Sequence, residues 1–278
     1  MREIVPIFGH NSFDSELLPF NFGAEGVRLN THDKSMVPIS KNISEYSSSQ
    51  IKSAHYSFEF EGINKDIAMH DITLILLSCR ITQSMTSPYI KYRYTAGLEN
   101  SGVILTETPT TNETHLKKQK YYSDKCLNQV KDMFLGLKSM EFVSERTANA
   151  LYFVSRELYS QHWIDSFIFL SSAIESLLSK DKAGGATKAI VRRLAYFLSE
   201  YNVEEQEISN LYSVRSEFVH GRYRYEPDKQ QDNLELLGRM EQLTYWLLKK
   251  YVSEALYNHY ETKVRRDKFL GNISLTAA

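Results

Sequence analysis

The sequence predicts an α+β protein, in which an antiparallel α-helical bundle follows a mixed region that favours strands. Two observations lead to this fold class. Residues 1–112 contain much of the glycine and proline, together with short runs that alternate apolar and polar residues. From about residue 115 proline almost disappears, and a 3.6-residue apolar period takes over. We therefore expect one domain over residues 1–112 and a second, helical domain over residues 113–278.

Three segments of the first half have strand character. Tyr56–Phe60 and Tyr89–Tyr94 alternate with a period of two, and Val103–Thr108 is rich in strand-forming residues. The apolar run Asp71–Ile81 fits either a buried strand or a short core helix, because periodicity alone does not separate the two.

The second half divides into amphipathic segments joined by short connections, as expected of an antiparallel bundle. The expected helices cover about 114–138, 144–161, 162–180, 187–200, 203–221 and 229–262. Ser144 opens the second helix without a capping box, since Thr147 stands where a glutamate would be needed. Asn202 is the expected N-cap of the fifth helix, and Gly221 is the expected end of that helix.

Composition excludes several classes of protein. With 42% hydrophobic residues the chain can bury a core, and 33 basic against 34 acidic residues argue against a non-specific nucleic-acid coat protein. Cys79 and Cys126 fit neither a zinc site nor a disulfide framework, so we expect buried thiols in a reducing cytoplasm. The first residues carry no apolar run that resembles a signal peptide, and the longest apolar stretches are too short to span a bilayer. We therefore expect a cytoplasmic protein without membrane, metal or cofactor.

The strongest functional signal is the pairing of Arg215 with His220, just before Gly221. Arginine is a permanent, fork-shaped clamp for phosphate, and histidine donates and accepts protons near neutral pH. Together they can cleave a phosphodiester without metal. Their five-position separation places them about 140° apart around a helix. A two-fold pairing of two such helices would gather both pairs around one cleft, so we expect a homodimer.

These residues resemble the signature of HEPN domains, specifically the Apea-like branch. The resemblance rests on three elements in order, Ala173–Leu178, Arg193–Ala195 and Leu211–Gly221, and it covers about residues 140–260. It implies a metal-independent endoribonuclease with an HEPN-like bundle, whose composite site forms across a dimer. His220 would be the acid/base, Arg215 would stabilise the phosphorane charge, and Ser216 would orient the phosphate.

The family also implies a biological setting. The chain would be a toxin-like effector in antiphage defence, acting on RNA or tRNA, with an antitoxin or another defence-system partner. Residues 1–112 would act as a sensor or regulatory domain. Family members that an antitoxin modifies carry a tyrosine two positions after the histidine, whereas this chain has Arg222 there and Tyr223 one position later.

The residues also allow other interpretations. Glu175 and Arg193 are either supporting residues of the site or members of a structural ion pair, and either Arg193 or Arg215 could neutralise Glu175. Arg222, Tyr223 and Arg224 either bind RNA or form an ordinary polar loop. The alternative functions are a catalytically inactive HEPN module, which binds RNA, a nucleotide or a protein partner, and a purely structural helical scaffold.

Overall fold

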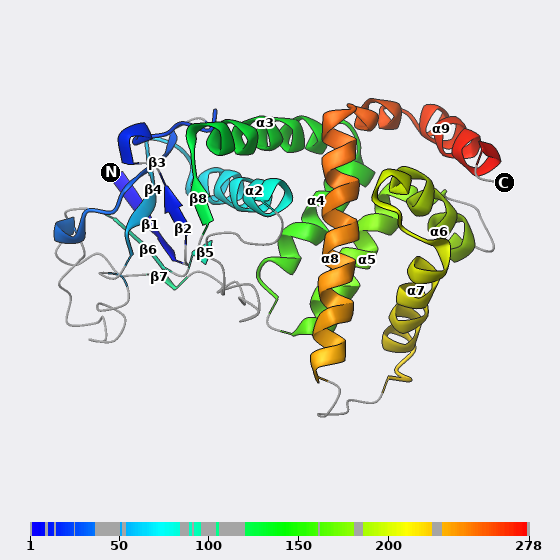
Figure 1. Ribbon diagram of the computed structural model, residues 1–278. Coiled ribbons are helices and arrows are strands. Elements are labelled where there is room, and N and C mark those ends of the chain that lie inside the picture. Colours follow the sequence, from blue (N-terminus) through cyan, green and yellow to red (C-terminus); the bar gives the residue numbers. More distant parts are fainter. Residues whose placement is uncertain are drawn as a thin grey trace. The chain divides into compact units, whose positions relative to one another are not determined.

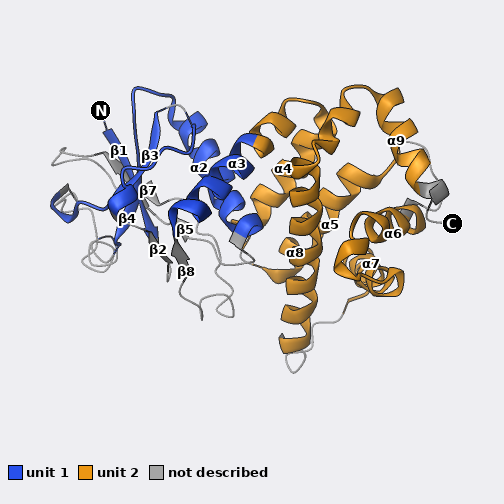
Figure 2. Ribbon diagram, turned by 45° about the horizontal axis from the view of Figure 1, so that its top comes forward, with its two compact units in different colours: residues 1–135 blue, residues 136–278 orange. Residues whose placement is uncertain are grey.

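A computed structural model of the chain (Figure 1) gives the fold. It describes residues 2–8, 11–13, 15–24, 26–36, 51, 54–83, 89–90, 92–95, 104–105, 120–160, 162–180, 186–223 and 230–276. The chain separates into two compact units, residues 1–135 and residues 136–278 (Figure 2). The division falls within helix α3, Asp124–Glu141. The residues around position 112, where the sequence predicts a boundary, lie outside the described residues.

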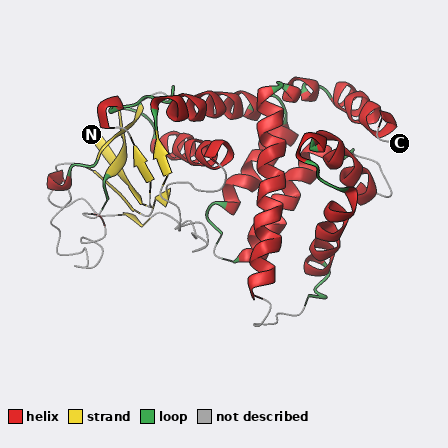
Figure 3. Cartoon of the chain, viewed as in Figure 1, coloured by secondary structure: helices red, strands yellow, loops and turns green. Residues whose placement is uncertain are grey.

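Unit 1 contains an antiparallel sheet and helix α2, so the prediction of a mixed, strand-rich first half is confirmed (Figure 3). Within the described residues the sheet order is β3-β4-β1-β6-β7, β5 also pairs with β1, and β2 pairs in parallel with β8. The elements are β1 Arg2–Phe8, β2 Asn11–Phe13, β3 Val27–Thr31, β4 Tyr56–Glu61, α2 Lys65–Gln83, β5 Tyr89–Ile90, β6 Tyr92–Thr95, β7 Ile104–Leu105 and β8 Lys120–Tyr122.

The centre of the sheet owes its stability to apolar residues that face one side. Val5 of β1 and Leu29 of β3 lie opposite Phe58 of β4, and all three are buried. Charged residues such as Arg28 alternate with them along the strands. The ambiguous run Asp71–Ile81 proves to be part of α2, which supplies much of the unit's apolar core.

Unit 2 is a helical bundle (Figures 1 and 3). Its elements are α4 Glu145–Glu157, α5 Trp163–Leu178, α6 Ala186–Phe197, η4 Ser199–Tyr201, α7 Glu205–Val219, α8 Gln230–Ser253, η6 Leu256–Tyr260 and α9 Lys263–Thr276. Helix α5 packs against α4, α6, α7 and α8, which accounts for its being the most apolar of the predicted helices. The whole chain is therefore α+β, as the sequence predicts.

Three predicted details of the helices are wrong. Thr147 does close a capping box at α4, because its hydroxyl accepts from the Ser144 N–H at 3.1 Å in place of a glutamate carboxylate. Asn202 adopts a left-handed conformation (φ 53°) that ends η4, and Glu204 is the N-cap of α7. The long last helix ends at Ser253, because Ala255 is left-handed (φ 51°) and the chain turns there into η6 and α9.

No helix in the described ranges combines the length and the apolar character that a membrane crossing requires.

Candidate functional site

Helices α5 and α7 pack together and bring Glu175 to Arg215, although the two residues are 40 positions apart. The Arg215 Nη2 donates to the Glu175 Oε2 at 2.9 Å. The two side chains are 27% and 28% exposed, so the pair lies at the edge of the bundle rather than in its core. This answers the question that the sequence left open, since Arg215 and not Arg193 neutralises Glu175.

The buried side of this pair contains polar atoms that lack partners. The Arg215 Nε and the Tyr212 hydroxyl are both buried without a hydrogen bond. Tyr212 lies three positions before Arg215 on α7, and its side chain is only 3% exposed. Burial raises the pKa of Tyr212 well above its ordinary value, and the nearby Glu175 charge raises it further. Tyr212 is therefore a neutral phenol beside the ion pair.

The surroundings of Glu175 make the free energy of unfolding depend on pH. Burial raises the pKa of its carboxyl above the ordinary value of 4.5, and attraction to Arg215 opposes that rise. The folded state then holds this proton more tightly than the unfolded state. The corresponding stability is fully present below pH 4.5 and is lost as the pH rises through the raised pKa. Relative to Glu175→Gln, we expect the wild type to lose up to about 1 kcal/mol of unfolding free energy between pH 4 and pH 7.

Urea unfolding of both proteins at the two pH values measures this difference. Glu217→Gln is the matched control, since Glu217 is an exposed carboxyl on the same helix α7. That substitution should leave the pH dependence unchanged. A wild type that gains stability over Glu175→Gln as the pH rises would show that attraction to Arg215 outweighs burial.

His220 is the C-cap of α7, and its side chain is exposed. Gly221 follows with φ +65°, its N–H donates to the Phe218 carbonyl, and the Arg222 N–H donates to the Glu217 carbonyl at 2.8 Å. These two bonds form a Schellman motif, in which a left-handed glycine satisfies the last carbonyls of a helix. The predicted helix end at Gly221 is thus confirmed, and the motif fixes the backbone that carries the His220 imidazole.

An aromatic cluster supports the turn after His220. Trp163 and Phe167 of α5 pack edge-on against Phe218 of α7, and Tyr223 packs edge-on against Trp163 and Phe218, with ring centroids 5.6 and 4.7 Å away. The Tyr223 side chain is half-buried in these contacts. Because Trp163 and Phe218 both contact the Tyr223 ring, this ring stabilises the turn after His220. A contact of Tyr223 with RNA would use the part of the side chain that these two rings do not cover.

The remaining predicted residues of this region have different surroundings. Arg222 is exposed and its side chain is available to a phosphate, while Arg224 lies outside the described residues. Ser216 is half-buried on α7, and its carbonyl accepts the His220 N–H at 3.1 Å. Among the described residues no hydrogen bond or ion pair joins Arg215 to His220, as expected from their separation around the helix.

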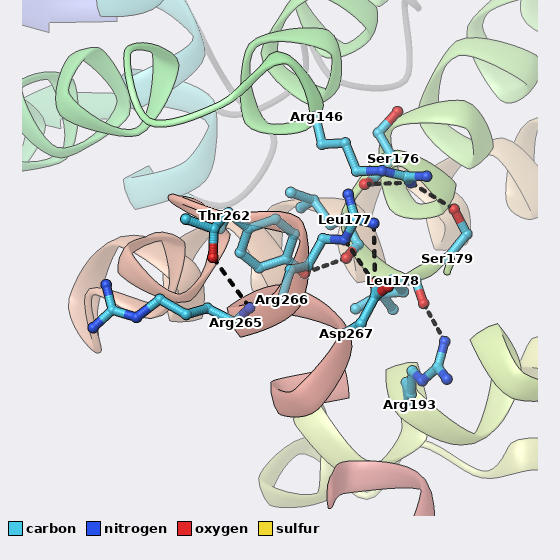
Figure 4. Close-up of polar contacts among 11 residues, drawn as sticks. Arg146, Ser176, Leu177, Leu178, Ser179, Arg193, Thr262, Arg265, Arg266 and Asp267 are labelled. Atoms are coloured by element: carbon cyan, nitrogen blue, oxygen red, sulfur yellow. Dashed lines mark hydrogen bonds and ion pairs between the residues drawn. The ribbon is translucent and has the colours of Figure 1, made fainter. Parts of the chain in front are cut away.

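Arg193 lies in a second polar cluster, at the carboxyl end of α5 (Figure 4). It is 4% exposed, its Nη1 donates to the Leu178 carbonyl at 2.5 Å, and its Nε donates to the Leu270 carbonyl at 3.1 Å. Burial lowers the pKa of its guanidinium, although Tyr260 and Tyr251 oppose this effect. These hydrogen bonds connect Arg193, which lies on α6, to α5 and α9, as expected of a structural residue.

Two more side chains satisfy neighbouring carbonyls of α5. The Arg146 Nη1 donates to the Ser176 carbonyl at 3.3 Å (Figure 4). The Tyr260 hydroxyl donates to the Leu177 carbonyl. Arg146 and Arg193 also place positive charge at the negative end of the helix dipole. The sequence did not single out Arg146, Tyr260 or Tyr212. Only for Tyr212 was a signal present, since it lies three positions from Arg215 on one helix face.

The chemistry available to these residues is that of anion binding and proton transfer. Arg215 offers a positioned guanidinium, and His220 offers a solvent-accessible imidazole at the end of the same helix. Within the described ranges, no group of three or more His, Cys, Asp or Glu residues could hold a metal ion. Cys79 is buried and Cys126 is half-buried, and both are free thiols.

Comparisons with protein-family models, with curated proteins and with solved structures found no match to this chain. The assignment of a function therefore depends on the side chains themselves.

Proposed function

We propose that the chain is a metal-independent HEPN endoribonuclease that cleaves RNA or tRNA, acting as a toxin-like effector in antiphage defence. The observation that carries this proposal is the arrangement on α7. Glu175 holds the Arg215 guanidinium at 2.9 Å, and the exposed His220 follows on a backbone fixed by the Schellman motif. A phosphate-binding group and an acid/base thus come from one rigid helix and its cap.

The proposed reaction needs only these two groups. His220 takes the proton of the ribose 2′-hydroxyl, or gives a proton to the leaving 5′ oxygen. The 2′ oxygen attacks phosphorus, the bond to the 5′ oxygen breaks, and the products carry a 2′,3′-cyclic phosphate and a 5′-hydroxyl. Arg215 stabilises the negative charge that develops on the phosphorane. Glu175 is a positioning residue, because it contacts Arg215 and not the reacting atoms.

Cleavage of total cellular RNA and of tRNA by the purified protein in excess EDTA tests this proposal. We expect fragments that end in 2′,3′-cyclic phosphate. Fragments that end in 3′-hydroxyl, or activity that requires an added divalent cation, would contradict the mechanism. End-group analysis of the gel-purified fragments separates these outcomes.

A homodimer with a composite site is part of the proposal, since Arg215 and His220 do not meet in one chain. Mixing inactive Arg215→Ala and His220→Ala proteins tests it. A mixed dimer would keep one wild-type arginine and one wild-type histidine, from different chains. Random exchange makes half of the dimers mixed, so we expect cleavage to recover to at most about one half of the wild-type rate. No recovery, with subunit exchange demonstrated by differently tagged proteins, would place both groups in a single chain.

The second candidate is a catalytically inactive HEPN module that binds RNA, a nucleotide or a protein partner. The Glu175–Arg215 ion pair favours it, because a neutralised arginine is a weaker stabiliser of developing charge. Such a module would bind RNA without cleaving it, with or without divalent metal. Electrophoretic mobility shifts measured beside the cleavage assay distinguish the two candidates.

A further inference from the structure

A pocket of about 510 Å³ lies in unit 1, along strands β3 and β4 and the start of β1. Its polar lining comes from Arg2, Arg28, Asn30, Glu59 and Glu61. Small-molecule sites in proteins have volumes of roughly 300–1,000 Å³. The pocket is therefore large enough for a ligand of several non-hydrogen atoms.

The carboxylate of Glu59 is the organising group of this pocket. It is 11% exposed, Arg2 Nη2 contacts its Oε1 at 2.5 Å, and Asn30 Nδ2 donates to its Oε2 at 3.1 Å. The Asn30 Oδ1 in turn accepts from the Thr31 N–H at 2.9 Å. The Glu59 Oε1, whose close contact is the Arg2 ion pair, is buried without a hydrogen bond, and Arg2 and Asn30 are both held against this carboxylate.

Arg28 is the second arginine that lines the pocket. It lies directly opposite Glu59 on the neighbouring strand, but both Glu59 oxygens are already engaged by Arg2 and Asn30. Its side chain is exposed and makes no ion pair or hydrogen bond within the described part of the chain. Unlike the guanidinium of Arg2, which Glu59 neutralises, that of Arg28 is available to a ligand.

Gly26 in the wall of the pocket occupies a position that requires glycine. Gly26 has φ +73°, and a Cβ atom there would lie 2.8 Å from the Ile63 Cγ2. A side chain at this position would be strained by the backbone conformation and by the contact. The pocket therefore combines a restricted backbone at Gly26, an Arg2 paired with Glu59, and an Arg28 without an ion pair in the described part of the chain.

We propose that this pocket binds a small molecule through an oxyanion, a phosphate or carboxylate group, held by Arg28 beside Arg2. The planar guanidinium fork matches both kinds of oxyanion. The site is independent of Arg215 and His220, and it gives unit 1 a ligand of its own.

Nuclear magnetic resonance of protein labelled with ¹⁵N-arginine tests the proposal on the full chain. The side-chain Nε–H signals are followed during titration with inorganic phosphate and, separately, with citrate, at an ionic strength kept constant with sodium chloride. We expect a saturable shift of the Arg28 signal with one of the two anions. Saturation by phosphate alone would identify a phosphate ligand, and saturation by citrate alone a carboxylate ligand.

Two variants show whether the effect belongs to the pocket. Arg28→Gln, in which binding is followed through the neighbouring Arg2 Nε–H signal, should weaken binding about 10- to 100-fold, the loss expected for one charged hydrogen-bonding group. Lys34→Gln is the matched control, since it removes one exposed positive charge from the same unit outside the pocket. It should leave the affinity unchanged. Shifts that never saturate with either anion, or equal weakening by both substitutions, would overturn the proposal.

Discussion

The His220→Ala variant is expected to cleave RNA about 10²- to 10⁴-fold more slowly than the wild type, which is the usual contribution of a general acid or base. The imidazole is exposed, and the hydrogen bond of His220 to the Ser216 carbonyl of α7 is made by its backbone N–H, which alanine keeps. Loss of the side chain should therefore leave the helix end intact. Single-turnover cleavage in excess EDTA gives the rate, and circular dichroism with a thermal melt establishes that the fold is unchanged.

The matched control is His55→Ala, because His55 is an exposed histidine in unit 1. It should cleave at the wild-type rate. Cleavage that persists in His220→Ala would remove this residue from the reaction, and the preparation would then have to be searched for a contaminating nuclease. A loss of rate in both histidine variants would indicate a general effect on the protein rather than on the site.

The parts of the fold that local signals specify could be predicted from the sequence. Gly221 ends α7 because a left-handed glycine is the common way to close a helix. The apolar period placed α5 and α7 within a few residues of their observed bounds. Local signals failed where a residue adopts a rare conformation without glycine. Ala255 is left-handed although alanine rarely is, so nothing in the sequence marked the break after α8.

The candidate site was predictable in its residues and not in its pairings. Arg215 and His220 stand out because they are neighbours in the sequence with complementary chemistry. The partner of Glu175 is 40 positions away, and the choice between Arg193 and Arg215 depends on how α5, α6 and α7 pack. Sequence periodicity identifies the buried face of each helix, but it does not say which residues of two faces meet.

The role of Arg193 also depends on contacts between helices that sequence periodicity does not reveal. The resemblance in the sequence predicts that Arg193 is a supporting residue of the site, yet its described hydrogen bonds end on the carbonyls of Leu178 and Leu270. A buried guanidinium that satisfies backbone carbonyls on α5 and α9 acts on the stability of the bundle. The two roles make opposite predictions for a substitution that preserves the length of the side chain.

We expect Arg193→Met to lower the unfolding free energy of unit 2 by about 3 kcal/mol, since two hydrogen bonds from a buried charged donor are lost. Both tryptophans of the chain, Trp163 and Trp246, lie in unit 2, so tryptophan fluorescence during urea unfolding reports on this unit alone. Arg192→Met is the matched control, as the adjacent arginine is only half-buried. Under conditions where the variant stays folded, its cleavage rate should equal that of the wild type. A structural role predicts that the substitution lowers stability and leaves the chemistry of Arg215 and His220 untouched. A variant with full stability and lost cleavage would instead make Arg193 a residue of the site.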